Sequence, residues 1–178
     1  MRRDERRRLL RYLAGVISIA LSAPPHGQSV PGATDITAAQ VQQFLKDLPP
    51  NVAADKAIRV VDVGGYRIGV YGAARQKAAP GDAISHETSA TEIYLILEGS
   101  GLLVTGGSLR EPITRYKSPE NGWTNTSSKF VDGGQSRHVA KGDIIVIPPH
   151  LVHQWTTLDT DITYLIFRPD PTNELILK

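Results

Sequence analysis

From Ala57 onward the sequence consists of short apolar runs separated by glycine or proline, and this pattern constrains the fold more than any other feature. The runs are rich in β-branched and aromatic residues: IRVVDV, YRIGVYGAA, TEIYLILEG, GLLVTGG, GDIIVIP and ITYLIF. Such runs are typical of an all-β sandwich or barrel. Within them, IYLIL and IIVI are apolar at every position, so we expect both faces of those strands to be covered. The sequence therefore predicts two sheets that pack together.

One helix is predicted before the strands, over residues 37–48 (TAAQVQQFLKDL). Thr37 and Gln40 have the spacing of a capping box. Apolar residues recur on one helical face at Val41, Phe44, Leu45 and Leu48. The prolines at 49 and 50 end the helix. We expect it to pack on the outside of a sheet and to take no part in the chemistry.

The N-terminus predicts an export signal. Six arginines against two acids give residues 1–27 a charge of +4, and an uncharged run, Tyr12–Ala23, follows the arginines. A basic segment before a short apolar run is typical of a secretory signal peptide, and twelve residues are fewer than the roughly 20 of a transmembrane helix. The stretch ERRRLLR resembles a twin-arginine signature, with Glu5 where Ser or Thr is usual.

These features predict a signal peptide over residues 1–23, a Pro- and Gly-rich linker over 24–35, and a single domain over 36–178, with strands over 57–170. The mature protein is then periplasmic or extracellular, without stable membrane association after processing. A membrane-anchoring N-terminal helix and a misassigned start codon are the alternatives.

Composition excludes several classes of protein. The 178 residues are 40% hydrophobic and 21% charged, which is typical of one globular domain. The chain has no cysteine, so disulfides, thiolate metal ligands and a cysteine nucleophile are excluded. Since the total charge is +2, the chain beyond residue 27 carries −2 and has no basic cluster, and nucleic acid is not an expected partner.

Two stretches some fifty residues apart carry the candidate metal ligands. In SHETSATEIYLILEG, His86 and Glu92 lie six positions apart, and in GDIIVIPPHLVHQWT, His153 lies five positions after Pro148. Side chains of equal parity on neighbouring strands of a β-barrel point to the same side. Two imidazoles and a carboxylate suit Fe, Mn, Ni, Co, Cu or Zn, and leave positions open on the metal.

Together these stretches resemble the two motif blocks of the cupin superfamily. One block is Gly, H-x-H, three or four residues, Glu, six residues, Gly; the other is Gly, five residues, P-x-G, two residues, His, three residues, Asn. The resemblance covers residues 81–157 in motifs. It implies a single jelly-roll β-barrel, one divalent transition metal held by His86, Glu92 and His153, a small-molecule ligand, and a homodimer.

The sequence departs from the motifs at three positions. Thr88 stands where the family has its second His, His150 where it has Gly, and Thr157 where it has Asn. A threonine hydroxyl is a poor metal ligand, so Thr88 either holds a metal-bound water or marks a weak or absent metal. A rival register uses Glu87 as the missing ligand, but its strand parity is opposite to that of His86.

Other residues are candidates for the pocket or for positions behind the ligands. Tyr94 shares strand parity with Glu92, and Trp155 shares it with His153, so each either faces the cavity or packs in the core. His150 is either a structural turn residue or a fourth ligand.

The segment Leu109–Gln135 is polar and rich in Gly, Pro and Asn, which predicts a long loop that is either functional or disordered. Trp123 within it either pins the segment to the domain or lines a pocket.

Two function classes follow from the resemblance. The first is an enzyme acting on a small organic molecule, of dioxygenase, lyase or isomerase type, and the second is a non-catalytic cupin that binds or senses a small molecule or metal. A metal-free barrel would leave Glu92 buried without a cation, and Glu92 would then need a hydrogen-bonding partner or a raised pKa.

Overall fold

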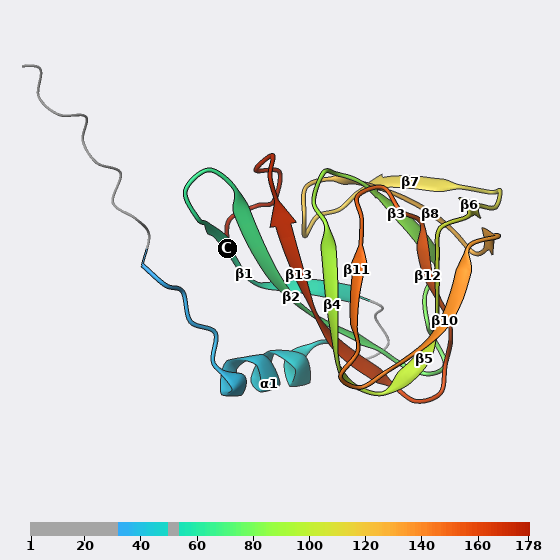
Figure 1. Cartoon of the computed structure of the whole chain (residues 1–178), viewed down its shortest axis with the longest axis horizontal. Helices are drawn as coiled ribbons and strands as arrows, with labels where there is room; N and C mark the ends of the chain where they lie inside the picture. The colour runs from blue at the N-terminus through green and yellow to red at the C-terminus, as the bar shows by residue number, and fades with distance from the viewer. Residues whose placement is uncertain (1–31, 50–53) are drawn as a thin grey trace, which may run out of the picture. The chain divides into compact units, whose positions relative to one another are not determined.

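The computed structural model describes residues 32–49 and 54–178. The predicted signal peptide and most of the predicted linker lie outside the described residues. One helix and thirteen strands make up the described part (Figure 1). They are α1 (Ala38–Asp47), β1 (Ala54–Asp62), β2 (Arg67–Arg75), β3 (Ala83–Glu87), β4 (Glu92–Glu98), β5 (Ser100–Thr105), β6 (Ser108–Leu109), β7 (Thr114–Lys117), β8 (Thr124–Ser128), β9 (Val131–Asp132), β10 (Gln135–Ala140), β11 (Ile144–Ile147), β12 (His153–Leu158) and β13 (Ile162–Asp170). Among these residues, no helix combines the length and the apolar character needed to span a membrane.

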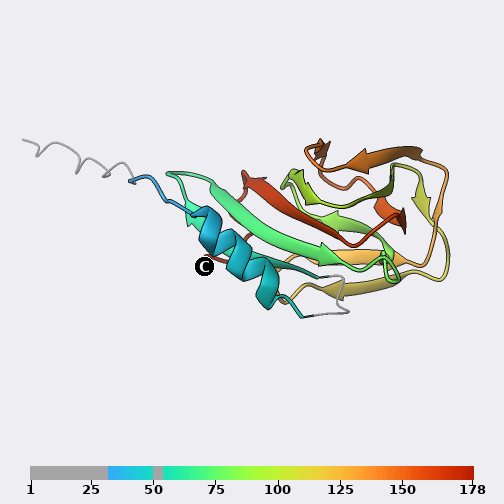
Figure 2. The ribbon, with the colours of Figure 1, turned by 90° about the horizontal axis from the view of Figure 1, so that it is seen from below.

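Two antiparallel sheets form the body of the domain. The first sheet has the order β1-β2-β13-β4-β11 and the second β10-β5-β12-β3-β8-β7, while β6 and β9 pair separately. Strands that are consecutive in sequence, such as β3 and β4, lie in opposite sheets, so the chain passes repeatedly between the two layers seen in Figure 2. This is the predicted all-β jelly roll, although the described sheets do not close into one continuous ring.

The inner faces of the two sheets carry the core. Buried and less buried residues alternate along β4, where Glu92, Tyr94 and Ile96 point inward. The prediction that both faces of IIVI are covered is wrong, because Ile144 and Val146 are 67% and 59% exposed. The reason is topological: β11 is an edge strand of the first sheet, and only its inner face meets the second sheet.

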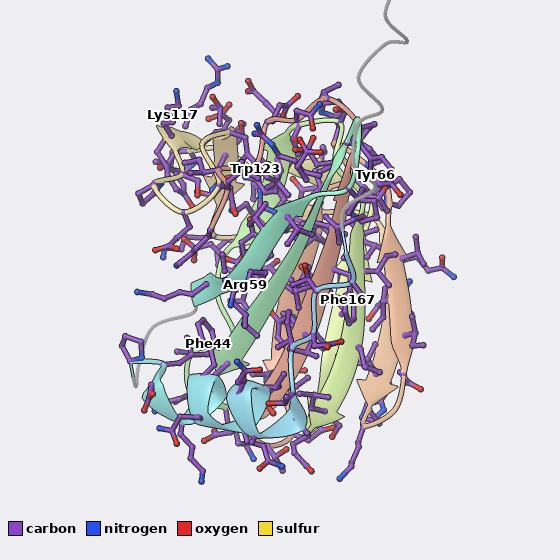
Figure 3. The ribbon with its side chains drawn as sticks, turned by 90° about the vertical axis from the view of Figure 1, so that its left-hand side faces the viewer. Phe44, Arg59, Tyr66, Lys117, Trp123 and Phe167 are labelled. Carbon is purple, nitrogen blue, oxygen red and sulfur yellow. The ribbon has the colours of Figure 1, made fainter. Side chains whose placement is uncertain are left out.

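Helix α1 lies against the outer side of the first sheet. The predicted capping box is present, with Thr37 and Gln40 bonded reciprocally. Phe44 lies between α1 and β2 (Figure 3) and sits over Gly72, where an added Cβ would come within 2.9 Å of the Phe44 ring. A glycine on β2 thus allows the close approach of the helix, and the helix stays away from the interior.

The prediction of a long loop over Leu109–Gln135 is wrong. The segment contains β7, β8 and β9, and β8 pairs with β3 along its whole length. The sequence TNTSS of β8 lacks an apolar pattern, and its strand conformation comes from pairing with β3 and β7, which local propensity does not report. This pairing sets Asn125 opposite His86.

Candidate metal centre

The structure brings His86, Glu92 and His153 together between the two sheets. One donor atom from each lies within 4.8 Å of the other two. Glu92 Oε2 is 3.5 Å from His86 Nε2 and 3.4 Å from His153 Nε2. His86 comes from β3 and His153 from β12 of the second sheet, and Glu92 comes from β4 of the first. The group therefore joins the two layers.

Each histidine is oriented by a hydrogen bond at its other ring nitrogen. His86 Nδ1 lies 2.7 Å from Asn125 Oδ1, and His153 Nδ1 lies 3.0 Å from the carbonyl oxygen of Leu151. Both partners accept, so both Nδ1 atoms donate and each ring directs its Nε2 toward Glu92. Metal-binding histidines in proteins usually have such a partner, which fixes the tautomer.

Glu92 is held by a buried arginine that sequence analysis did not identify. Arg168 donates from Nε to Glu92 Oε1 at 2.8 Å, and it also bonds Asp55 Oδ2. The side chains of Arg168 and Glu92 are 1% and 3% exposed. The guanidinium lies over the rings of Tyr71 and Trp123, 4.2 and 5.0 Å from their centroids. With Oε1 occupied by Arg168, Oε2 of Glu92 is left to face the two histidines.

The charges of this group act on each other's pKa values. Burial opposes ionisation of Glu92, but the charges of Arg168 and His86 outweigh it and hold the Glu92 pKa well below its usual range. Burial also opposes the charged form of His86, yet the Glu92 carboxylate raises the His86 pKa. For His153, burial dominates and lowers the pKa to about 4. At neutral pH, His153 is therefore an uncharged donor beside an ionised Glu92.

Tyr94 stands next to the three donors. Its hydroxyl lies 3.3 Å from His153 Nε2 and 3.4 Å from Glu92 Oε2. Burial and the neighbouring Glu92 charge raise the Tyr94 pKa well above 10, so the hydroxyl keeps its proton at neutral pH and can donate it in a hydrogen bond.

Thr88 and Glu87 do not join the donor group. Thr88 is buried, but its hydroxyl accepts a hydrogen bond from the Ala90 backbone N–H at 3.1 Å. This bond closes a short turn between β3 and β4. Glu87 lies on the exposed side of β3 and pairs with Arg115, whose Nε is 2.8 Å from Glu87 Oε1. This placement agrees with the strand parity of Glu87, which is opposite to that of His86.

His150 and Trp155 also lie apart from the donors. His150 is exposed and has a φ of 63°, the left-handed conformation that favours glycine. It thus occupies the turn position where the motif has Gly, and its carbonyl oxygen accepts from Ser85 Oγ. Trp155 is buried in the hydrophobic core and packs against Tyr164.

Trp123 belongs to the core and also contacts the site. It is 4% exposed, and its ring centroid lies 5.4 Å from that of His86. It therefore both pins the β7–β8 segment to the domain and packs against His86.

Sequence analysis missed Asn125, Arg168 and Asp55. A signal for Arg168 was available, because a charged residue ends the apolar run ITYLIFR with the strand parity of buried Tyr164. Asn125 gave no local signal, since its role depends on the pairing of β8 with β3.

A cavity of about 190 Å³ adjoins the donors. His86, His153 and Tyr94 line it, as do Ile84 and Ile166, and the β7–β8 segment contributes Tyr116 and residues 118–121 to its lining. This volume is below the ~300–1,000 Å³ of pockets for drug-sized ligands, so the cavity suits a small molecule.

The donor set fits a divalent transition metal. Zinc bonds of about 2.1 Å in a tetrahedral arrangement place ligand atoms roughly 3.4 Å apart. The two distances from Glu92 Oε2 to the histidine nitrogens, 3.5 and 3.4 Å, match this spacing. Nitrogen and oxygen donors of this kind bind several first-row metals, so they do not select one.

No family profile and no curated protein matches the sequence. Among solved structures, the chain is similar to a protein with a double-stranded β-helix domain from Klebsiella pneumoniae (16% identity, 82% of this chain and 97% of that chain covered, TM-score 0.43). It is also similar to a cupin family protein from Methanocaldococcus jannaschii (8%, 70% and 89%, TM-score 0.36). A third similar structure is hydroquinone 1,2-dioxygenase from Sphingomonas with 4-hydroxybenzoate bound (12%, 78% and 82%, TM-score 0.41).

The topology of the chain brings the two motif blocks together. Two facing antiparallel sheets are wound from alternating parts of the chain, and residues of the two motif blocks meet between them. The chain is thus an all-β protein of jelly-roll type whose two motif blocks resemble those of the cupin superfamily.

Proposed function

We propose that this protein is an exported single-domain cupin that binds one divalent transition metal through His86, Glu92 and His153 and acts on a small organic molecule. The reaction is of the dioxygenase, lyase or isomerase type. The observation that carries the proposal is the orientation of the donors. Both histidines direct Nε2 at Glu92 Oε2 because an acceptor holds each Nδ1–H.

A bound divalent metal would supply a Lewis acid at the inner side of the cavity. The chain's own residues prepare that position. Arg168 fixes Oε1 of Glu92, so the carboxylate cannot rotate away from the histidines. Tyr94 keeps a proton on its hydroxyl beside His153 and can donate a hydrogen bond to an oxygen of the bound molecule. Ile84 and Ile166 give an apolar contact surface in a cavity whose lining is otherwise largely polar.

A non-catalytic cupin that binds or senses a small molecule or metal is the second candidate. The identity of Thr88 favours it: where the cupin motif has a second histidine, this chain has a neutral hydroxyl that is bonded to the Ala90 N–H, so the group has two histidines and one glutamate. Fewer donors give a weaker hold on the metal, which suits reversible binding.

Metal analysis tests the proposal. Protein purified without a histidine tag should retain about one equivalent of metal per chain by elemental analysis. Protein that holds no metal after refolding with each of Fe, Mn, Ni and Zn would contradict it. To separate enzyme from binding module, the metal-loaded protein is incubated under air with small carboxylic acids and phenols that raise its melting temperature. Consumption of such a ligand indicates an enzyme, and recovery of the intact ligand indicates a binding module.

Export is the part of the proposal that concerns residues 1–35, most of which lie outside the described residues. It is supported by the arginine-rich start and the uncharged run Tyr12–Ala23. A reporter fused to residues 1–35 should appear in the periplasm, and the double substitution Arg6→Lys and Arg7→Lys should retain it in the cytoplasm if the twin-arginine route is used. Export that is unaffected by the double substitution would point to a general secretory signal.

Formation of a homodimer, which the resemblance to cupins implies, is also part of the proposal. Light scattering of the purified domain gives the mass in solution directly. A monomeric mass at micromolar concentration would contradict the dimer without touching the metal site.

A further inference from the structure

We propose that Arg75 binds the carboxylate of the molecule that enters the metal-centre cavity, so that the ligand is a small organic acid. This inference rests on the proposed function and names its ligand class. Arg75 is the last residue of β2 and lies on the same face of the strand as Tyr71 and Ala73, which are 0% and 1% exposed. Its side chain therefore points between the two sheets.

Arg75 stands where two hollows meet. It lines the cavity at the metal donors and also a neighbouring hollow of about 340 Å³, and Ile84 and Tyr116 line both. The second hollow continues toward Asp82 and Ser127 on the side of β3 and β8. A molecule that extends from one hollow into the other would lie beside the Arg75 side chain.

The guanidinium of Arg75 is fixed in place, yet it has no acidic partner within residues 32–49 and 54–178. Its Nε donates to the Tyr164 hydroxyl at 2.8 Å, and its Nη1 donates to the Pro80 carbonyl at 3.1 Å. The other arginine of the cavity, Arg168, is bonded to both Glu92 and Asp55. A largely buried arginine stays charged, and burying a charge is costly unless it is paired. Arg75 is thus a preformed cation at the cavity wall.

The donors left on Arg75 match a carboxylate. A guanidinium has five N–H donors, and the bonds to Tyr164 and Pro80 use two. One N–H on Nη1 and two on Nη2 remain, and the adjacent N–H groups of Nη1 and Nη2 form the edge that binds a carboxylate through two parallel hydrogen bonds. Neither water nor a neutral hydroxyl satisfies both donors and the charge together.

The distribution of charge in the cavity determines the orientation in which an acid binds. On β2, Arg75 lies four residues beyond Tyr71, roughly 13 Å along the strand, and the Tyr71 ring lies under Arg168. Glu120 also lines the cavity, but it neighbours Asn121, which accepts from Arg168 at 3.2 Å, so Glu120 belongs to the Arg168 end. An acid whose carboxylate meets Arg75 leaves its other end near Tyr94 and His153, beside the metal donors.

Binding of simple acids to the zinc-loaded protein tests this inference. Acetate, pyruvate and benzoate are compared with the neutral acetamide and benzamide by calorimetric titration, in wild type, Arg75→Gln, Arg75→Lys and Arg59→Gln. Arg59 is an exposed arginine of β1 and serves as the matched control. At least one acid should bind wild type and Arg59→Gln equally, bind Arg75→Gln at least tenfold more weakly, and bind Arg75→Lys with an intermediate loss. The amides should bind all four proteins alike.

Two results would overturn the inference: no acid binds wild type more tightly than the amides, or Arg75→Gln binds the acids as wild type does. Zinc content, measured on the same samples, separates the two proposals. One equivalent of zinc with acid binding that ignores Arg75 refutes the carboxylate subsite and leaves the metal proposal standing. If the protein holds no zinc and still binds the acid only when Arg75 is present, the metal proposal is refuted and the carboxylate subsite stands. If circular dichroism shows that Arg75→Gln does not fold, the acid affinity of Arg75→Lys is compared with that of wild type instead.

Discussion

Replacing Asn125 with alanine should weaken metal binding although Asn125 is not a metal ligand. Asn125 Oδ1 accepts the His86 Nδ1–H at 2.7 Å and so keeps the proton on Nδ1 and the lone pair on Nε2. Without that acceptor, the tautomer with its proton on Nε2 becomes populated, and that tautomer cannot bind a metal at the nitrogen facing Glu92. The ring is also free to turn about its χ2 angle.

The expected loss of metal affinity in Asn125→Ala follows from what hydrogen-bond acceptors of metal-binding histidines contribute. Loss of the group that orients a metal-binding histidine typically costs about 10- to 100-fold in metal affinity, which corresponds to roughly 1.4–2.8 kcal/mol. The His86 side chain is 11% exposed, so water can replace the lost acceptor only in part. We therefore expect the loss for Asn125→Ala to fall within this range.

Competition for Zn²⁺ against a chromophoric chelator at pH 7 measures the affinity. Asn125→Asp keeps an acceptor at the same position and should bind zinc at least as tightly as wild type. Thr126→Ala changes the next residue of β8, whose hydroxyl lies near the exposed Glu87, and should leave zinc affinity unchanged. If Asn125→Ala binds zinc within twofold of wild type, or if Thr126→Ala shows the same loss, the orienting role of Asn125 is wrong.

Three further predictions concern the site and the fold. By elemental analysis, Glu92→Gln should lower the metal content at least tenfold, because Glu92 is central to the donor group. His150→Ala should leave the metal content unchanged, because His150 is a turn residue. The reverse result would place the metal site at the turn. Removing metal with EDTA should lower the melting temperature by roughly 5–10 °C in calorimetry. Metal present at 100 times its Kd adds about 2.7 kcal/mol to the free energy of unfolding, which corresponds to this shift in a domain of this size. An unchanged melting temperature would contradict a metal that joins the two sheets. Phe44→Ala should lower the free energy of unfolding in urea by about 1–2 kcal/mol. This is less than for a fully buried Phe, because Phe44 is only partly buried over Gly72. The zinc affinity should not change, and a change would mean that the helix affects the site.

That His86, Glu92 and His153 lie together could be predicted because each lies in a local motif whose spacing is visible in a single sequence. His86 and Glu92 lie in one block and His153 in the other, and the structure brings their donor atoms within 4.8 Å. The helix could be predicted for the same reason, since the Thr37–Gln40 capping box and the apolar stripe are local signals.

The residues that orient the donors could not be predicted, because their roles depend on pairings between distant parts of the chain. Arg168 lies 76 residues after Glu92, and Asn125 lies 39 residues after His86. The polar segment that contains Asn125 had the composition of a loop, and only its pairing with β3 makes it a strand. Likewise, the apolar run of β11 contains no sign that the strand lies at a sheet edge with one face exposed.

The buried charges explain why this site suits a cation even with Thr88 in place of a second histidine. At the Arg168 end of the cavity, away from Arg75, the buried Glu92 and the 29% exposed Asp55 carry two negative charges around the single positive charge of Arg168, which leaves one negative charge in excess there. An unbalanced charge in such a place costs several kcal/mol. A proton on His86 would balance it, and a divalent metal held by the three donors would supply positive charge in place of that proton. Substituting a neutral threonine for a neutral imidazole removes a donor but does not change this charge. The demand for a cation is therefore set by side chains on β1, β4 and β13, and it persists when one neutral ligand is lost.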